Sequence, residues 1–291
     1  MDSITHTLFG LAIYGSIDKK DMGKSKKRAY LLTALGASQI PDIDVVSRFW
    51  DSEGLYQMWH RGITHSLFLT PIWAALFILL SYLLFNVKDL KLFFLGWLAV
   101  LIHDTSDLFN AWGTGYLEPF SSIRISFGTI PIIDFVFLSI IGVAFIASRI
   151  NKMKSSYYFK FAWAFIVLHV IVQSVQGWII YNQYENEYDQ IALSADFIPW
   201  TYNVITKNDS KVAIFQDNLF SDKKLQYELT SAENANLNNL FKERPEARTL
   251  YEWSPFVVIV DDGEKLGVYD PRFYRNGQSF LFEYIDRTQN N

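Results

Sequence analysis

Residues 66–87 read SLFLTPIWAALFILLSYLLFNV and contain no charged side chain. The hydrocarbon core of a bilayer is about 30 Å thick, and roughly 20 apolar residues in a helix are needed to cross it. This stretch is both long enough and apolar enough to do so. It therefore predicts a membrane-spanning helix, and with it a mainly α fold class.

Five other apolar segments flank this stretch. Three of them are Leu92–Ile102, which runs directly into His103 and Asp104, Ile125–Ser148 and Phe161–Tyr181. The other two, Ile4–Ile17 and Tyr30–Ile40, are short for spans, and they are either full spans or buried or re-entrant helices. We expect a polytopic helical membrane domain of about six helices over residues 1–182.

Basic residues in the short loops indicate which membrane face is cytoplasmic. With six spans, one set of loops carries most of them: Lys19, Lys20, Lys24, Lys26, Lys27, Arg28, Lys88, Lys91, Arg149, Lys152, Lys154 and Lys160. The opposite set carries Arg48, Arg61 and Arg124. We therefore expect a multi-pass protein of the bacterial plasma membrane, with loops 41–65 and 107–130 and both termini outside the cytoplasm.

The chain becomes polar from about Glu185 onward. Strand-like runs occur at residues 211–216 and 256–260, and a DDGE turn at 261–264 leads to a further run at 266–269. This pattern predicts a β-hairpin with a glycine turn. With a helical stretch near 232–241, it indicates a small soluble α+β or β-rich domain over residues 183–291, on the extracytoplasmic side.

Composition excludes several functional classes. Half of the 291 residues are apolar and 19% are charged, which fits neither a disordered chain nor a typical soluble enzyme. The net charge of −4 argues against a general nucleic-acid binder, so we expect no nucleic-acid partner. The chain has no Cys, so any metal must be held by imidazole and carboxylate. Its start lacks the basic region of a cleavable signal peptide, and we expect a mature N-terminus.

Histidine and aspartate gather at one predicted membrane face. Four of the five histidines fall in the first 110 residues, each near an Asp or another His. Ionisable groups in or beside spanning helices are costly and usually face a functional interior. The predicted ligands of a divalent metal are His6, Asp42, Asp44, His60, His65, His103 and Asp107. This donor set suits Zn, Mn or Fe. Because it exceeds the four ligands of one zinc ion, it indicates either two ions or one ion with supporting side chains.

Each piece alone also has a simpler interpretation. The Pro41–Asp44 sequence is a common turn, and His103 with Asp107 could form a local hydrogen bond on a helix. His169, in the middle of the last apolar segment, is interpreted as a packed histidine. Asp134 could join the site or pair with Arg124.

Arg61 and Arg124 are the basic residues closest in sequence to the predicted ligands. Either could hold an anionic group of a substrate through a charge-assisted hydrogen bond. Contact with a lipid headgroup is the alternative for both.

A short internal repeat relates two of the histidines. Ile4–Phe9 (ITHTLF) matches Ile63–Phe68 (ITHSLF) at five of six positions. Each copy opens an apolar segment, and a returning segment then ends in carboxylates, Asp42 and Asp44 in one case and Asp104 and Asp107 in the other. We interpret this as a duplicated helical hairpin with His at its entrance and Asp at its exit.

These motifs resemble the YdjM/YfhP-type family of bacterial membrane-bound, metal-dependent hydrolases. The matching pieces are Met1-Asp2 with Thr5-His6, Pro41–Asp44, HRGITHS at 60–66, His103 with Asp107, Trp112–Thr114, Pro119-Phe120 and Arg124. HRGITHS is the most specific of them, and the resemblance covers roughly residues 1–150. It implies a helical membrane protein with several spans and a hydrolase activity.

The first functional hypothesis is a metal-dependent hydrolase at the extracytoplasmic leaflet, with Asp104 or Asp44 as the general base. A phosphoester of a lipid or lipid-linked molecule suits clustered metal, an Arg and the interfacial location. The second is a non-enzymatic metal-binding regulator or scaffold whose tail domain binds a partner, in which protein ligands fill every coordination position. A transporter, the third, requires ionisable groups near mid-membrane, where only His169 and Asp134 approach.

Overall fold

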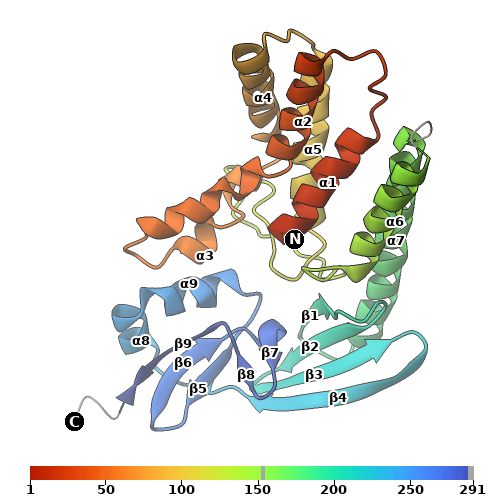
Figure 1. Ribbon diagram of the computed structural model, residues 1–291. Helices are drawn as coiled ribbons and strands as arrows, with labels where there is room; N and C mark the ends of the chain where they lie inside the picture. The colour runs from red at the N-terminus through yellow and green to blue at the C-terminus, as the bar shows by residue number, and fades with distance from the viewer. Residues whose placement is uncertain (152–154, 288–291) are drawn as a thin grey trace. The chain divides into compact units, whose positions relative to one another are not determined.

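The computed structural model describes residues 1–151 and 155–287, and the chain forms two compact units (Figure 1). The first unit consists of Met1–Asp44 and Arg61–Ser174, and the second of Val45–His60 and Val175–Asn291. The division therefore falls inside a helix, and a loop from the first half of the sequence belongs to the second unit. Lys152 and Lys154, which contribute to the charge pattern above, lie outside the described residues.

The first unit is helical. Its helices are α1 (Ser3–Gly15), α2 (Lys24–Ala37), α4 (Thr70–Phe85), α5 (Lys91–Asp107), α6 (Phe135–Ile150) and α7 (Ser155–Tyr184) up to Ser174, and its 3₁₀ turns include η2 (Ile63–His65) and the start of η1 (Ile40–Phe49). Consecutive helices α1 and α2 pack together, as do α4 and α5, and α2 also packs on both α4 and α5. A helical first half is thus confirmed.

The length of these helices differs from the prediction. Within the described residues, α7 is the helix that is long and apolar enough to cross a bilayer, and a second crossing is reached only if Tyr56–His65 and Thr70–Phe85 together count as one bent span. The helices α1, α2, α4, α5 and α6 have 13 to 17 residues, and at 1.5 Å per residue they are only about 20–26 Å long. Six full spans therefore stay a prediction.

Polar residues at the helix ends explain the shorter lengths. The Asp134 carboxylate accepts hydrogen bonds from the backbone N–H groups of Val136 and Phe137, so α6 begins at Phe135 and not near Ile125. Asn86 adopts a left-handed conformation (φ 53°) and ends α4. Asp2 caps α1 in the same way as Asp134 caps α6.

Close packing of α1 against α2 brings the two parts of the first predicted hairpin together. A Cβ atom added to Gly10 would lie 2.8 Å from the Ala34 carbonyl oxygen, so only glycine permits this approach. Gly36 has a similar role, because a Cβ there would collide with the Phe77 ring. Small residues of this kind are what membrane helices use to pack closely.

The two halves of the sequence repeat differ in local structure. The first copy lies inside α1, whereas the second forms the turn η2 and the residues that lead to α4. His6 is therefore in the first turns of a helix, and His65 precedes its helix by five residues. The two predicted hairpins share the same order of segments along the chain, but His6 lies in a helix and His65 lies in a turn.

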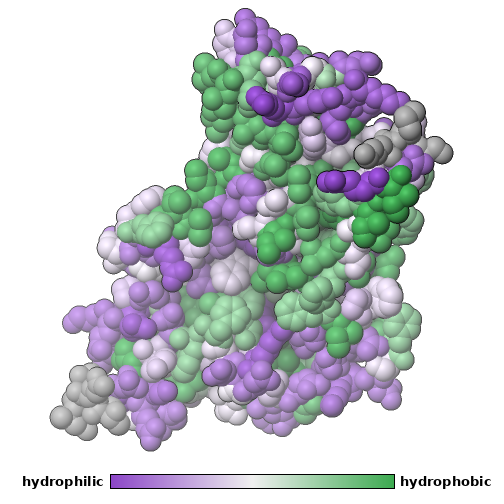
Figure 2. All heavy atoms as spheres, in the orientation of Figure 1, coloured by the Kyte–Doolittle hydropathy of each residue, from purple (hydrophilic) through white to green (hydrophobic). Residues whose placement is uncertain are grey.

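Many apolar side chains of the first unit are exposed. They include Leu83 and Leu84 on α4, Val143 and Ile146 on α6, and Phe161 and Phe165 on α7. Figure 2 shows hydrophobic residues over much of the surface of the helices drawn at the top of Figure 1. A contiguous surface of this kind indicates contact with lipid or with another apolar partner.

The second unit contains the predicted sheet domain. Strands β1 (Gln190–Ala195), β2 (Tyr202–Asn208), β3 (Lys211–Asn218) and β4 (Ser221–Thr230) form an antiparallel meander, and β5 (Val258–Asp261), β6 (Lys265–Tyr269) and β9 (Phe282–Asp286) form a second antiparallel sheet. A short pair, β7 (Tyr274–Arg275) and β8 (Gln278–Ser279), lies between β6 and β9 in the chain. The helices are α3 (Tyr56–Trp59), α8 (Asn238–Glu243) and α9 (Pro245–Trp253), and α3 packs on α9. The predicted hairpin is confirmed, with Gly263 at φ 88° in its turn.

A buried ion pair in the second unit is expected to contribute to the stability of that unit, and this can be tested. Asp270 and Arg272 are almost fully buried, and Arg272 Nη2 lies 2.5 Å from Asp270 Oδ2. Removing one partner of a buried pair leaves an uncompensated charge and costs about 3–5 kcal/mol. We expect Asp270→Ala to lower the unfolding free energy by this amount, measured by hydrogen exchange of the β5–β6–β9 sheet in the full chain. Glu252→Ala, which breaks the exposed pair with Arg248, should cost at most about 1 kcal/mol. Equal protection in both variants would contradict the prediction.

Candidate metal centre

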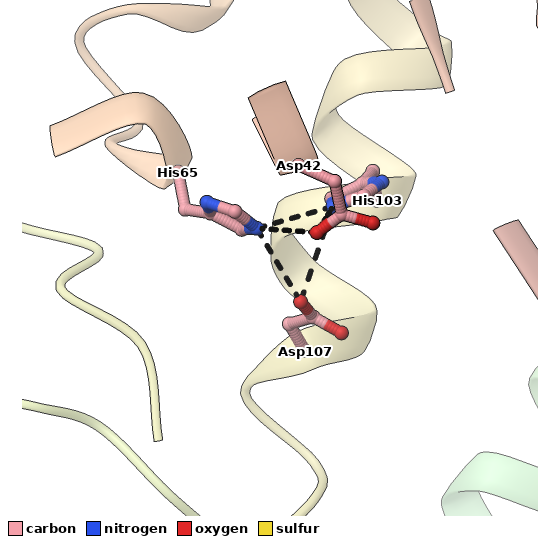
Figure 3. Close-up of side chains that lie close together, drawn as sticks. All are labelled: Asp42, His65, His103 and Asp107. Atoms are coloured by element: carbon pink, nitrogen blue, oxygen red, sulfur yellow. Dashed lines mark hydrogen bonds and ion pairs between the residues drawn. The ribbon is translucent and has the colours of Figure 1, made fainter. Parts of the chain in front are cut away.

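Four ionisable side chains meet at one end of the first unit (Figure 3). Asp42 lies in η1 after α2, His65 lies in η2 before α4, and His103 and Asp107 are one turn apart at the end of α5. Each residue offers one atom that could bind a metal, and these four atoms all lie within 4.8 Å of one another. Three of the four residues are buried, and Asp42 is partly exposed. This group could hold a metal ion.

The distances between the facing atoms fit a first-row divalent ion. His65 Nε2 lies 3.2 Å from His103 Nε2, 3.4 Å from Asp42 Oδ1 and 3.6 Å from Asp107 Oδ2. His103 Nε2 lies 3.6 Å from Asp42 Oδ1 and 3.9 Å from Asp107 Oδ2. Two ligands about 2.0–2.1 Å from a tetrahedral zinc ion lie roughly 3.4 Å apart. The observed separations are of this size.

Hydrogen bonds made by the Nδ1 atom of each imidazole orient the ring so that its Nε2 atom faces the other three residues. His103 Nδ1 lies 2.8 Å from the Ser38 carbonyl oxygen, which can only accept, so Nδ1 donates. His65 Nδ1 lies 3.3 Å from Asp44 Oδ2, again an acceptor. In neutral imidazoles both Nε2 atoms are therefore acceptors. Hydrogen-bonded partners of this kind are what orient metal-ligating histidines.

With both imidazoles neutral, the four facing atoms are thus two nitrogen acceptors and two carboxylate oxygens, and none of them can donate a hydrogen bond to another. Acceptors buried 3.2–3.9 Å apart repel one another unless a positive charge lies between them. A proton can bridge only one pair at a time, whereas a divalent cation contacts all four. The residues present fit a bound metal.

Asp42 is ionised in this surrounding. Burial alone would raise the pKa of the Asp42 carboxyl, but hydrogen bonds from the imidazoles of His103 and His65, when these rings carry a proton on Nε2, hold that pKa well below its ordinary value. A bound cation in place of these protons would act on Asp42 in the same direction. Its negative charge, with that of Asp107, balances a divalent cation. Asp107 Oδ2 also lies 3.1 Å from Arg61 Nε, and its Oδ1 contacts the Met1 amino group.

Asp44 holds the turn that carries His65. Its Oδ2 accepts hydrogen bonds from the backbone N–H of Arg61, at 2.7 Å, and from the Thr64 hydroxyl, at 2.9 Å. Arg61 itself adopts a left-handed conformation (φ 57°), which this bond stabilises. The HRGITHS sequence is therefore a turn built around the Asp44 carboxylate, and it sets the position of His65.

His6 lies directly behind the group of four. Its ring stacks on that of His103, with centroids 3.6 Å apart, and its Nε2 lies 3.3 Å from Asp107 Oδ1. The side chain is fully buried, and neither ring nitrogen makes a hydrogen bond within the described part of the chain. A buried imidazole without hydrogen bonds is a further possible ligand for a cation at this site.

Asp104 is also buried beside this group. Its two carboxylate oxygens have no hydrogen-bond partner among the residues that the structure describes. Such a group is costly to bury as a free anion, so its placement next to a candidate cation site is chemically informative.

The two predicted substrate-binding arginines differ in their contacts. Arg61 is buried and uses its side chain within the protein: Nη1 donates to Asn110 Oδ1, Nη2 to the Met1 carbonyl oxygen, each at 2.9 Å, and Nε faces Asp107. Arg124 is partly exposed and lies on the loop where Thr114 pairs with Ile125. Its Nη2 donates a hydrogen bond to the Gly113 carbonyl oxygen, at 3.5 Å.

Three other residues occupy places that sequence reasoning did not anticipate. His60 belongs to the second unit, where its ring stacks on Tyr56. Asp134 pairs with His169, at 3.0 Å, and caps α6, so neither of its two expected partners is found. His169 is accordingly the partner of a carboxylate and more than a packed histidine.

Two groups that shape the site were missed in the sequence. The Ser38 carbonyl fixes the His103 tautomer, and a main-chain acceptor leaves no sequence signal. Asn110 positions Arg61, and its place three residues after Asp107 was the available indication.

Comparison with known proteins identifies the family of this chain. The YdjM inner membrane protein family matches residues 1–180, which confirms the resemblance drawn from the motifs. The YfhP protein of Bacillus subtilis (strain 168) is 35% identical over 145 residues, which cover 48% of this chain and 44% of that protein. The chain thus covers less than half the length of this relative. No solved structure matches this chain. By the family match, the chain belongs to the YdjM inner membrane protein family.

Proposed function

We propose that this membrane protein is a metal-dependent hydrolase that cleaves a phosphoester of a lipid or lipid-linked substrate at the extracytoplasmic face. The observation that carries the proposal is the convergence of one possible ligand atom each from Asp42, His65, His103 and Asp107, all within 4.8 Å of one another. A divalent cation supplies Lewis-acid chemistry there, since it activates water at neutral pH and polarises an ester oxygen.

The ligand roles follow from the contacts. Asp42, His65, His103 and Asp107 hold the ion, which is Zn or Mn by the mixture of nitrogen and oxygen donors. Asp44 orients His65, and Arg61 offsets part of the Asp107 charge. His6 is the further ligand available to a second ion, because its ring is buried against that of His103 and neither ring nitrogen makes a hydrogen bond among the described residues.

Asp104 is the better of the two proposed general bases. The Asp44 Oδ2 atom already accepts two hydrogen bonds and contacts His65, so moving a proton to it would break the turn. Asp104 has no such hydrogen bonds and lies on the same helix as His103 and Asp107. Arg124, partly exposed, is the residue that could bind an anionic group of the substrate.

The arrangement of the helix ends supports the proposed orientation. The α1–α2 and α4–α5 turns lie side by side, with Lys26 Nζ 2.6 Å from Asp89 Oδ2, at the end of α1 and α5 opposite to His6 and Asp107. Basic loops favour the cytoplasm. The metal centre then lies toward the outer face, as does the tail domain.

One observation favours a non-enzymatic rival. Four protein ligands fill a tetrahedral ion completely, as in structural zinc sites, whereas a catalytic ion keeps a position for water or substrate. X-ray absorption at the metal edge distinguishes the two. An additional oxygen ligand that is displaced by phosphate supports the hydrolase, and a closed set of four protein ligands unaffected by phosphate supports a regulator or scaffold.

The metal ligands can be tested by metal content. We expect His103→Ala to lose the bound ion, because it removes one donor and the contact to Ser38, and Asp107→Asn to weaken its retention. His60→Ala is the matched control, since His60 is not one of the four residues that meet at the site, and it should retain the metal. Elemental analysis of each purified protein gives the result, and a His103→Ala protein with unchanged metal content contradicts the assignment.

The role of Asp104 can be tested separately from metal binding. We expect Asp104→Asn to keep at least one equivalent of metal and to lower the rate of phosphoester hydrolysis by roughly 10²–10⁴-fold, the usual contribution of a general base. Asp44→Asn should act mainly through the position of His65 and weaken metal retention. An Asp104→Asn protein with full metal and full activity excludes Asp104 as the base.

The orientation can be tested with single cysteines, because the chain contains none. We expect Ser25→Cys to be labelled only after the membrane is permeabilised, and Ser122→Cys to react in intact cells. Asp209→Cys, in the turn between β2 and β3, should behave like Ser122→Cys if the tail domain is extracytoplasmic. Labelling of positions 25 and 122 from the same side refutes this topology.

A further inference from the structure

We infer that an apolar cavity beside the metal centre binds a hydrocarbon chain of the substrate, so that the substrate is a lipid ester and not a water-soluble phosphate. This inference deepens the proposed function and rests on it. The cavity has a volume of about 290 Å³ and lies among α1, α5, α6, α7 and the loop that carries Ile130. Residues that line it include Phe9, Thr105, Ile130, Phe137, Trp163 and Val167.

One end of the cavity adjoins the metal centre. Thr105 and Ser106 line it, and they lie between His103 and Asp107 on α5. Phe9, on the wall formed by α1, is in edge-to-face contact with His6, whose ring stacks on His103. Met1 also lines the cavity and contacts Asp107. A ligand in this space is therefore separated from the predicted metal ligands by a single layer of side chains.

The other end of the cavity lies on the surface that faces lipid. Val167 and Ile171 line it, and each is 54% exposed on α7, the helix that is long enough to cross a bilayer. Both residues lie near the middle of that helix, where the surrounding medium is hydrocarbon. Access from this side is open to an acyl or prenyl chain and closed to a charged headgroup.

The lining of the cavity decides the chemistry of its occupant. It contains no charged side chain, and the hydroxyl-bearing members, Thr105 and Ser106, are on the wall nearest the metal centre, as is Met1, whose amino group contacts Asp107. Protein interiors seldom leave voids much larger than a water molecule, whose share of liquid volume is about 30 Å³. This space is several times larger and too apolar for ordered water. A hydrocarbon chain is the partner that fits it.

The two ends together imply an orientation for the bound molecule. With its chain between Ile130, Phe137 and Trp163, the polar end points toward Thr105 and the Asp107 side of the metal group. Specificity for a lipid then comes from apolar burial at about 25 cal/mol per Å², while the ion and Asp104 act on the ester.

The cavity can be tested by photo-crosslinking of the full chain in nanodiscs. The probe is phosphatidic acid with a diazirine in its acyl chain, and peptides are identified by mass spectrometry. We expect labelling of the segments that contain Phe137 and Trp163. Ile130→Trp, which fills the cavity, and Val167→Trp, which blocks its exposed end, should both lose most of this labelling. Ile146→Trp, at an exposed position on α6 outside the lining, is the matched control. Labelling confined to other lipid-facing surfaces, or unchanged in both cavity variants, overturns the inference.

The headgroup of the probe separates a substrate from ordinary bilayer lipid. The same diazirine chain on phosphatidylcholine should label the cavity less than the phosphatidic acid does, because the phosphomonoester can reach the metal centre. Equal labelling by both probes assigns the cavity to bulk lipid and overturns the substrate assignment. Val167→Trp allows the same comparison if Ile130→Trp does not fold.

A hydrolysis assay keeps this inference distinct from the proposed function. Wild-type protein is assayed with a long-chain alkyl phosphate and with a water-soluble aryl phosphate. We expect Val167→Trp to retain metal and activity on the aryl phosphate but to lose activity on the long-chain ester through a higher KM. Equal effects on both esters overturn the cavity assignment. Failure of the wild type to cleave either ester refutes the hydrolase itself, while the crosslinking result still decides whether a chain binds.

Discussion

Two imidazole nitrogens and two carboxylate oxygens face one another inside the first unit, with each nitrogen 3.2–3.9 Å from the other three atoms, and with neutral rings none of the four has a hydrogen to donate. In a buried place such an arrangement is repulsive unless a cation occupies its centre. Much of the surrounding structure serves to hold it. The Ser38 carbonyl and the Asp44 carboxylate turn the two rings, and Arg61 offsets one of the carboxylates.

The helical framework makes this convergence possible. Gly10 allows α1 and α2 to touch, which sets His6 near the end of α2 and close to Asp42. α5 delivers His103 and Asp107 from one helix face, and its neighbour α4 is preceded by the turn of His65. The helices place their basic turns at one end and their acids and histidines at the other. An apolar cavity lined by residues of α1, α5, α6 and α7 lies beside them. We propose a lipid ester as the substrate because it would use both features.

Sequence patterns predicted those parts of the site that depend on local spacing. His103 and Asp107 were recognisable as an i,i+4 pair on a helix, and Asp42 and His65 as ionisable residues at the ends of apolar segments. His60, only five residues from His65, carries the same chemical signal, yet the chain between Val45 and His60 packs with the second unit through α3 and α9. Tertiary packing places His60 and His65 in different units, and no local sequence pattern predicts this separation.

Other features escaped prediction for similar physical reasons. Strand β4 contains Lys223, Lys224 and Glu228 and is mostly exposed, so it lacks the apolar alternation that marks a half-buried strand. The helix expected from Ile125 begins only at Phe135 because the Asp134 carboxylate caps it. The partnership of Asp134 with His169 joins residues 35 positions apart and depends on the packing of α6 against α7.

Anomalous diffraction at the absorption edge of the metal, from crystals of the full chain, tests the central claim most directly. We predict one strong peak within bonding distance of Asp42, His65, His103 and Asp107, with any second peak beside His6. Metal-replete protein whose only peak lies away from these residues, or whose four side chains are linked by protons and waters alone, would contradict it.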